Sequence, residues 1–333
     1  MSSPASPSTR STPDRRAETY LGVDGGGTKT ALCVLRGDGR VLARVEAPSC
    51  YYLGQDISLV EKVLDQGVTE VCAAADVRPS DLSHAFFGLP GYGEVSGDLA
   101  ALDAAPAAVL GHDRYRCDND MVCGWAGSLG ASDGINVVCG TGSMTYGERR
   151  SHGMRVGGWG EVFGDEGSAY WIAVRGLGLF SQMSDGRRPR GPLHALLREH
   201  LALETDLDLV DVVLNRWGGA RGEVAALSRV VVAAAEQGDA LAESILHEAA
   251  HALVDLVEAT RVGLGWDDGS TVPVSWSGGV FASTVVRESF TRGLELRSPH
   301  YELRTPQHDP VVGAALYAAR LHGTPVTAPL EET

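Results

Sequence analysis

The sequence is short of basic and aromatic residues and contains no long hydrophobic run. Its 333 residues include 28 Lys and Arg against 43 Asp and Glu, a formal net charge of −15 at pH 7. This balance argues against nucleic acids and anionic membranes as partners. No apolar run is long enough to cross a bilayer, and no signal peptide is evident. We therefore expect neither a nucleic-acid nor a membrane partner.

The six cysteines form no CxxC pair and lack the spacing of metal ligands. They predict reduced thiols in a cytoplasmic protein. Apolar residues make up 44% of the chain, as in ordinary globular proteins, and its length suffices for two domains. Residues 1–18, rich in Ser, Pro and Arg, are expected to form a disordered tail, and the end from about Gly323 is expected to be loose.

The predicted elements repeat along the chain. The first series has strands at 19–25, 29–36 and 41–47, a helix at 56–76, a strand at 83–88, a helix at 96–104, a strand at 113–118 and a helix from about 120. The second series has a strand at 135–139, another strand that ends near 147, and a third strand at 153–158. A helix-rich insert at 166–264, a strand at 272–276 and a helix follow. We infer duplicated α/β domains, one at 19–130 with a C-terminal helix at 310–322, the other at 131–309.

In each series, one glycine loop follows the first strand. In the first loop Asp24 precedes Gly25, Gly26, Gly27, Thr28 and Lys29. Glycines let backbone N–H groups turn inward around an anion, and Asp24 could hold a Mg²⁺ beside phosphates. The loop is not a Walker motif, because it lacks the spacing of glycines before a Lys-Ser/Thr pair. It is not a dinucleotide fingerprint either, because a second strand follows where a helix should start. The alternative interpretation is a glycine-rich hairpin turn.

The second loop is Gly140-Thr141-Gly142-Ser143, and the two loops together are suited to the β- and γ-phosphates of one nucleotide. A third loop contains Gly278 and Gly279 between a strand and a helix, where an adenine or ribose could pack against backbone. The second and the third loop are each also compatible with an ordinary tight turn.

Asp120 follows the predicted strand at 113–118, at the sheet edge where ligands bind in such folds. It could act as a general base toward an attacking hydroxyl. It could instead cap the helix that follows, and Asp118 is a rival for either role.

A second dense cluster contains Gly158, Trp159 and Gly160, followed by Asp165 and Glu166. The Trp159 ring offers a face for a sugar ring, the glycines expose backbone donors, and Asp165 can bind ring hydroxyls. Alternatively, Asp165 and Glu166 cap the next helix and favour its dipole.

Two further patterns have simpler explanations. His247-Glu248-Ala249-Ala250-His251 matches the zinc-protease HExxH pattern, but it also fits the polar stripe of an amphipathic helix. Arg187-Arg188-Pro189-Arg190 is most simply a solvated loop.

Together these motifs resemble the superfamily that joins sugar kinases, heat-shock chaperones and actin. The resemblance covers residues 19–322 and is closest to the N-acetylglucosamine kinases of the BadF/BadG/BcrA/BcrD-type ATPase family. It is most specific at Gly157–Gly160 and Gly164–Ala173. It implies two ribonuclease H-like, actin-like domains with an interdomain cleft that closes over the nucleotide, ATP and Mg²⁺ as cofactors, and a homodimer.

The resemblance also implies roles for individual residues. Asp120 is the catalytic base and Asp24 belongs to the metal site. Thr28, Thr141 and Ser143 contact the phosphates, within a nucleotide site made of Gly25, Gly26, Gly27, Thr28, Lys29, Gly140, Thr141, Gly142, Ser143, Gly278 and Gly279. Gly158, Trp159, Gly160 and Asp165 contact the sugar, whose 6-hydroxyl Asp120 would deprotonate.

The sequence departs from the family pattern at two places. Cys50 stands where the amino-sugar kinases have an Asn that holds the sugar, and the Gly88–Gly93 loop lacks a Ser-rich segment. We expect an ATP-dependent kinase of N-acetylglucosamine, and glucosamine and N-acetylmuramate remain alternatives. An ATPase that activates a partner enzyme is a further alternative, although the cysteines show no pairing for an iron–sulfur site. The zinc-binding cysteine cluster of another bacterial hexokinase group is missing.

Overall fold

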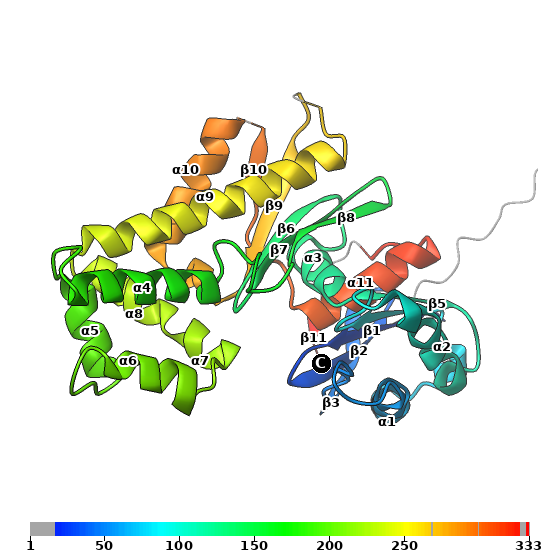
Figure 1. The fold of residues 1–333 in the computed structure, drawn as a ribbon. Helices are drawn as coiled ribbons and strands as arrows, with labels where there is room; N and C mark the ends of the chain where they lie inside the picture. Colours follow the sequence, from blue (N-terminus) through cyan, green and yellow to red (C-terminus); the bar gives the residue numbers. More distant parts are fainter. Residues whose placement is uncertain (1–16, 268, 299, 327–330, 333) are drawn as a thin grey trace, which may run out of the picture. The chain divides into compact units, whose positions relative to one another are not determined.

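The computed structural model describes residues 17–267, 269–298, 300–326 and 331–332 (Figure 1). The chain forms two compact units. Unit 1 contains the described residues up to Cys123 and those from Val311 onward, and unit 2 is Gly124–Pro310. No helix in the described ranges is long and apolar enough to cross a membrane.

Unit 1 is built on a mixed sheet in the order β11-β3-β2-β1-β4-β5. β1 pairs antiparallel with β2 and parallel with β4, and β4 pairs parallel with β5. The elements are β1 (Thr19–Gly25), β2 (Lys29–Arg36), β3 (Arg40–Pro48), α1 (Ser58–Ala74), β4 (His84–Leu89), α2 (Leu99–Leu110), β5 (Tyr115–Asn119), α11 (Pro310–His322) and β11 (Glu331–Glu332). Helix α3 (Met121–Leu129) contains the boundary between the units.

Unit 2 repeats this topology. Its sheet has the order β10-β9-β6-β7-β8, so its first three strands form an antiparallel meander and the next two add in parallel beside the first. The strands are β6 (Gly134–Cys139), β7 (Ser143–Arg149), β8 (His152–Gly157), β9 (Val272–Ser277) and β10 (Tyr301–Leu303). Apart from β11, which is added at the edge of the first sheet, the strand order is the same in both units, and this confirms the duplicated ribonuclease H-like, actin-like fold.

Between β8 and β9 unit 2 carries the helix-rich insert. Its helices are α4 (Ala169–Ser184), α5 (Pro192–His200), α6 (Asp208–Val210), α7 (Arg221–Ala226), α8 (Ser228–Glu236) and α9 (Ala240–Gly263), with a π-helical turn at Asp211–Arg216; α10 (Thr284–Arg297) follows β9. Helix α9 packs on the sheet face that carries Thr145, whose hydroxyl lies 2.6 Å from that of Thr260. The neighbouring Tyr146 turns its ring to Trp125 of α3, which fits the alternation of side chains along a strand.

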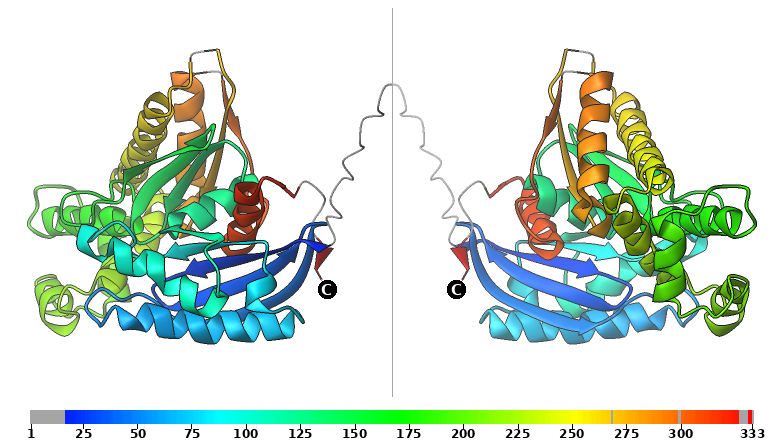
Figure 2. Two further views of the ribbon diagram at one scale, coloured as in Figure 1. Left: turned by 90° about the vertical axis from the view of Figure 1, so that its right-hand side faces the viewer. Right: turned by 90° about the vertical axis from the view of Figure 1, so that its left-hand side faces the viewer.

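Helices cover both faces of the first sheet (Figure 2). Leu21 and Val23 of β1 share a buried cluster with Leu64 and Val68 of α1. Gly22 points to the other face, where a Cβ would lie only 2.3 Å from the backbone nitrogen of Ala315 in α11. Glycine at this position therefore allows the C-terminal helix to pack directly on the backbone of the central strand.

Most strands have the predicted bounds, but the helix expected at 96–104 is wrong at both ends. It spans Leu99–Leu110 and continues through Pro106. Proline has no N–H to donate to the carbonyl of Leu102, one turn earlier. The thiol of Cys117 on β5 donates to that carbonyl instead, at 3.6 Å. A contact from outside the helix thus offsets part of the cost of a proline in its interior.

Both ends of the chain differ from expectation where they are described. Residues 1–16 of the predicted tail lie outside the described residues. Glu18, also placed in that tail, accepts a hydrogen bond from the Gly37 amide at 2.9 Å. Near the C-terminus, Glu331 and Glu332 pair in parallel with β3 rather than remaining loose. Strand β10 was not predicted.

Candidate functional site

In unit 1 the first glycine loop is a tight turn between β1 and β2. The amide of Gly26 donates to the Lys29 carbonyl at 2.8 Å, and the Ser49 hydroxyl donates to the Gly26 carbonyl at 2.7 Å. Gly27 and Thr28 at its tip are exposed. The Lys29 ammonium forms an ion pair with Glu46, on an exposed part of the neighbouring strand. The loop therefore exposes its backbone and the Thr28 hydroxyl to solvent, whereas the Lys29 ammonium group is bound to Glu46.

The carboxyl ends of the three parallel strands lie side by side in unit 1. Asp24 of β1 is in register with Gly88 of β4, and Gly88 is in register with Asp118 of β5. A Cβ on Gly88 would lie 3.1 Å from the Cα of Asp120. The structure thus places Asp120 next to the row that contains Asp24, as expected for acidic residues at the same edge of a parallel sheet.

The pKa values of two buried thiols reflect the negative charge at this edge of the sheet. Burial raises the pKa of Cys50, and the negative charges of Asp120 and Asp24 raise it further. Burial likewise raises the pKa of Cys123 well above its ordinary value, and the same two carboxylates contribute. Asp24 and Asp120 therefore act on the same small region of unit 1, and both thiols stay protonated there.

The start of helix α3 separates the possible roles of its acidic residues. The side-chain oxygen of Asn119 accepts a hydrogen bond from the Met121 amide at 3.2 Å. Asp118 pairs with Arg116 at 2.8 Å and accepts from the Asn119 amide. Asn119, which the sequence reasoning overlooked, thus satisfies the first amide of the helix. Asp118, the rival of Asp120, is already bound to an arginine.

In unit 2 the second glycine loop is held by the start of helix α4. The amides of Ala169 and Tyr170 donate to the carbonyls of Gly140 and Thr141, at 2.9 and 3.3 Å. Thr141 is exposed. Ser143 is 1% exposed, and its hydroxyl donates to the Glu166 carbonyl at 2.7 Å. Thr141 is therefore the hydroxyl that this loop presents to solvent, whereas Ser143 ties the loop to the segment before α4.

The third loop meets the second at a close approach of two backbones. A Cβ on Gly278, which has φ +101°, would lie 2.2 Å from the Cys139 carbonyl oxygen, so no other residue fits there without displacement. Gly279 has open space around its Cβ position. Gly278 thus allows the end of β9 to pass beside the end of β6, and Gly279 faces the cavity described next.

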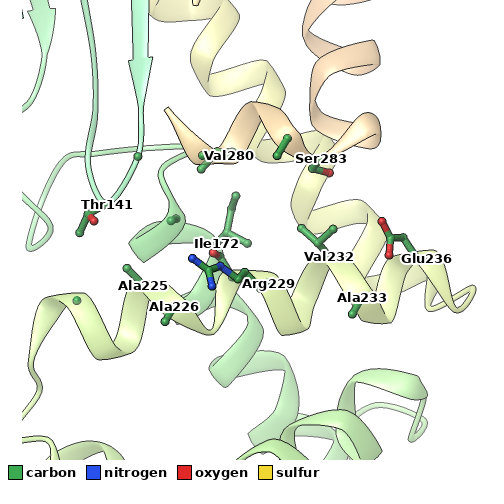
Figure 3. A pocket seen from close by; sticks show the side chains of 16 residues that line it. Thr141, Ile172, Ala225, Ala226, Arg229, Val232, Ala233, Glu236, Val280 and Ser283 are labelled. Atoms are coloured by element: carbon green, nitrogen blue, oxygen red, sulfur yellow. The ribbon is translucent and has the colours of Figure 1, made fainter. Parts of the chain in front are cut away.

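A cavity of about 670 Å³ in unit 2 is lined by both Gly140 and Thr141 of the second loop and Gly279 of the third. The rest of its wall comes from α4, the 3₁₀ turn after Gly278, and two insert helices that were not predicted as site elements: Ala169, Ile172, Gly222, Ala225, Ala226, Ser228, Arg229, Val232, Ala233, Glu236, Val280, Ala282 and Ser283. Figure 3 shows Thr141 at one end, Glu236 at the other and Arg229 between them. A mostly apolar chamber with a hydroxyl and glycine backbone at one end suits a nucleoside phosphate.

The segment Gly157–Gly167 precedes α4. Trp159 is 73% exposed, and Gly157, Gly158 and Gly160 all have φ values between +71° and +90°. The segment therefore presents an indole ring on a glycine-rich backbone. The amide of Gly158 donates to the Ser143 carbonyl at 2.9 Å, which places the ring's segment directly beside the second loop.

Asp165 in the same segment is buried and has φ +55°. Its carboxylate forms an ion pair with Arg221 at the start of α7, at 2.5 Å. It does not cap α4, because the Ser168 hydroxyl fills that role by accepting from the Trp171 amide at 3.1 Å. Arg221 is 56 residues away in sequence, so no local signal could have identified the pair.

The HExxH residues on α9 contact different neighbours. His247 shares a 2.7 Å hydrogen bond with Ser289 of α10, and Glu248 lies 3.8 Å from Arg175 of α4. Within the described residues, no three His, Cys, Asp or Glu side chains gather closely enough to form a metal site. Arg187, in the basic cluster noted in the sequence, pairs with Asp185 in an exposed loop.

Comparison with known proteins gives consistent matches along nearly the whole chain. The chain is 28% identical over 312 residues to an N-acetyl-D-glucosamine kinase from Dictyostelium discoideum, covering 90% of this chain and 98% of that one. It is 27% identical over 299 residues to an N-acetylmuramic acid/N-acetylglucosamine kinase from Clostridium acetobutylicum, covering 90% and 97%.

Among solved structures, a candidate N-acetylglucosamine kinase from Chromobacterium violaceum matches with a TM-score of 0.66 at 25% identity, covering 90% of this chain and 99% of that one. The model of one family matches residues 21–318, which include all three glycine loops and the segment Gly157–Gly167. The chain therefore belongs to the BadF/BadG/BcrA/BcrD ATPase family.

Proposed function

We propose that this protein is an ATP-dependent amino-sugar kinase that transfers the γ-phosphate to the 6-hydroxyl of N-acetylglucosamine. The observation that supports it most is the position of Asp120, at the carboxyl end of β5 and beside the row that contains Asp24. Two relatives that span nearly the whole chain are kinases of N-acetylglucosamine or N-acetylmuramic acid. The same chemistry is therefore the first to test.

The lining of the cavity in unit 2 supports a nucleotide site there. The apolar wall beside Val232 and Val280 would hold the base, and the Gly140–Thr141 end would hold the phosphates. Arg229 supplies a cation to this cavity. In unit 1, the Thr28 hydroxyl and the backbone from Gly25 to Gly27 would be able to donate to phosphate oxygens. Lys29 is a weaker candidate for this role because Glu46 binds its ammonium group.

A metal ion fits the acidic edge of unit 1 only together with substrate. Asp24 and Asp120 both act on the buried thiol of Cys50, so their charges lie close together. Mg²⁺ is commonly bound by one or two carboxylates plus phosphate oxygens and water, rather than by a protein cage. Asp24 would hold the ion, directly or through water, and the bound ion would neutralise charge on the phosphates.

Asp120 would act as the general base. Its carboxylate would accept a hydrogen bond from the 6-hydroxyl, orient the oxygen, and take its proton as the new bond to phosphorus forms. Trp159 would stack on the sugar ring, the backbone of Gly158 and Gly160 would bind ring hydroxyls, and Asp165 would accept hydrogen bonds from them. Each of these roles depends on positioning rather than on covalent chemistry by the protein.

The identity of the amino sugar is tested by a coupled assay of ADP release. N-acetylglucosamine, glucosamine and N-acetylmuramate are compared with glucose, each with ATP and Mg²⁺. We expect the highest kcat/KM with N-acetylglucosamine. Turnover of ATP that no sugar stimulates would contradict the proposal, and would favour an ATPase that acts on a partner enzyme.

A further inference from the structure

Arg221 bridges two carboxylates of the segment Gly157–Gly167. Its Nη2 lies 2.5 Å from Oδ2 of Asp165, and its Nε lies 3.2 Å from Oε2 of Glu161. The Asp165 side chain is 3% exposed, whereas that of Arg221 is 43% exposed. One edge of the guanidinium is therefore buried against Asp165, and the rest remains accessible to solvent.

The same ion pair abuts the second glycine loop. A Cβ on Gly142 would lie 2.7 Å from Nη2 of Arg221 and 2.7 Å from Oδ2 of Asp165. The preceding residues, Gly140 and Thr141, line the cavity. Glycine at 142 thus leaves room for the ion pair, and the pair ties the segment Gly157–Gly167 to the loop that ends the cavity.

Asp165 is held in a conformation that needs support. Its φ of +55° lies in the left-handed region, which is uncommon for residues other than glycine. A buried carboxylate is costly unless it is paired and hydrogen-bonded. Arginine can satisfy two carboxylates at once through its planar guanidinium, which a lysine ammonium does less well.

We propose that Arg221 is a positioning residue that holds the Asp165 carboxylate against the loop Gly140–Ser143, oriented to accept hydrogen bonds from the sugar. This inference rests on the proposed function, in which Asp165 contacts the amino sugar. Arg221 acts through Asp165 and not on the reacting atoms. Its loss should therefore weaken sugar binding much more than nucleotide binding or the chemical step.

The test compares Arg221→Ala and Arg221→Lys with Arg216→Ala, a matched control in the same insert whose guanidinium pairs with Asp211 at 2.7 Å. Sugar KM, kcat and the affinity for a non-hydrolysable ATP analogue are measured for each full-length variant. Hydrogen exchange is followed in peptides covering 140–145 and 158–166. Because Arg221 reaches solvent, guanidinium ions are added to Arg221→Ala as a chemical rescue.

We expect Arg221→Ala to raise the sugar KM about 10-fold or more, as for loss of one partner of a buried charge pair, while kcat and analogue affinity change about 3-fold at most. Exchange should accelerate in both peptides, guanidinium should reverse these effects in part, and Arg221→Lys should be intermediate. Arg216→Ala should match the wild type. If Arg221→Ala does not fold, Arg221→Lys takes its place: a smaller rise in sugar KM is expected, with unchanged analogue affinity, because a lysine ammonium bridges two carboxylates less well than a guanidinium.

An unchanged sugar KM in Arg221→Ala would overturn the inference. So would equal losses of sugar and nucleotide affinity that guanidinium does not restore. A wild-type protein that phosphorylates no amino sugar would refute the proposed function instead. Hydrogen exchange would then decide the positioning role alone: acceleration confined to the two peptides supports it, and unchanged exchange refutes it.

Discussion

The sulfur of Cys123 lies 2.2 Å from the position that a Cβ on Gly88 would occupy. β4 can therefore pass directly beside the first turn of α3 only because residue 88 has no side chain. The same close approach brings the backbone of Asp120 next to the carboxyl ends of β1 and β4. The position of the proposed base is thus fixed by backbone packing in unit 1.

Replacing Asp120 with Asn should remove the general base while preserving the size of the side chain. We expect kcat to fall by about 10²-fold or more, because this is the typical contribution of a positioned base. Calorimetric affinity for a non-hydrolysable ATP analogue should change little. Near-normal turnover in this variant would refute the role of Asp120.

Asp24→Asn should weaken the proposed metal site. We expect the Mg²⁺ concentration for half-maximal activity to rise about 10-fold or more, since loss of a carboxylate near a bound ion typically has this effect. Asp118→Asn is the control, because Asp118 occupies the same row of the sheet but pairs with Arg116. Equal Mg²⁺ dependence in the two variants would contradict the assignment.

Arg229 lines the cavity of unit 2, and within the described residues its guanidinium has no ion-pair partner. Arg229→Met should raise the KM for ATP about 10-fold, as expected for loss of a charged hydrogen bond to phosphate. Binding of adenosine should be unaffected. Arg187→Met, in an exposed loop, serves as the control. An equal loss of adenosine and ATP affinity would place Arg229 elsewhere in the nucleotide site.

His84 makes stability depend on pH. Burial lowers its pKa from 6.5 to about 4, and the positive charges of His322, His112 and Arg114 contribute. Below pH 6.5 the His84 imidazole takes up a proton more readily in the unfolded chain than in the folded one. The contribution of neutral His84 to the stability of the folded state is therefore complete above pH 6.5 and is lost as the pH falls toward 4. The midpoint of thermal unfolding should therefore fall over this range in the wild type, and fall less in His84→Gln. Parallel profiles for the two proteins would exclude His84 as a cause.

Local patterns in the sequence were sufficient to predict the repeated topology. Alternating apolar residues defined the strands, and glycine runs such as Gly25–Gly27 marked the turns between them. The end of α2 was missed because Pro106 is accommodated by a thiol on β5, a contact that has no local signal. β10 was missed because only three residues, Tyr301–Leu303, form it.

The candidate site was predicted unevenly for the same reason. The glycine loops and the acidic residues at strand ends follow from spacing within one segment. The role of Gly142 as the neighbour of an ion pair depends on Arg221, which belongs to another element. The cavity wall formed by α7 and α8 likewise required the fold, because Ser228, Arg229 and Val232 belong to an ordinary amphipathic helix in sequence.

The packing of α11 on Gly22 has a consequence for biosynthesis. The central strand of unit 1 emerges from the ribosome early, but its second face is covered by residues beyond Val311. All of unit 2 is translated in between. During synthesis, one face of the first sheet therefore stays uncovered until the C-terminal helix has been made. A chaperone that shields apolar surface would be most useful to this protein in that interval.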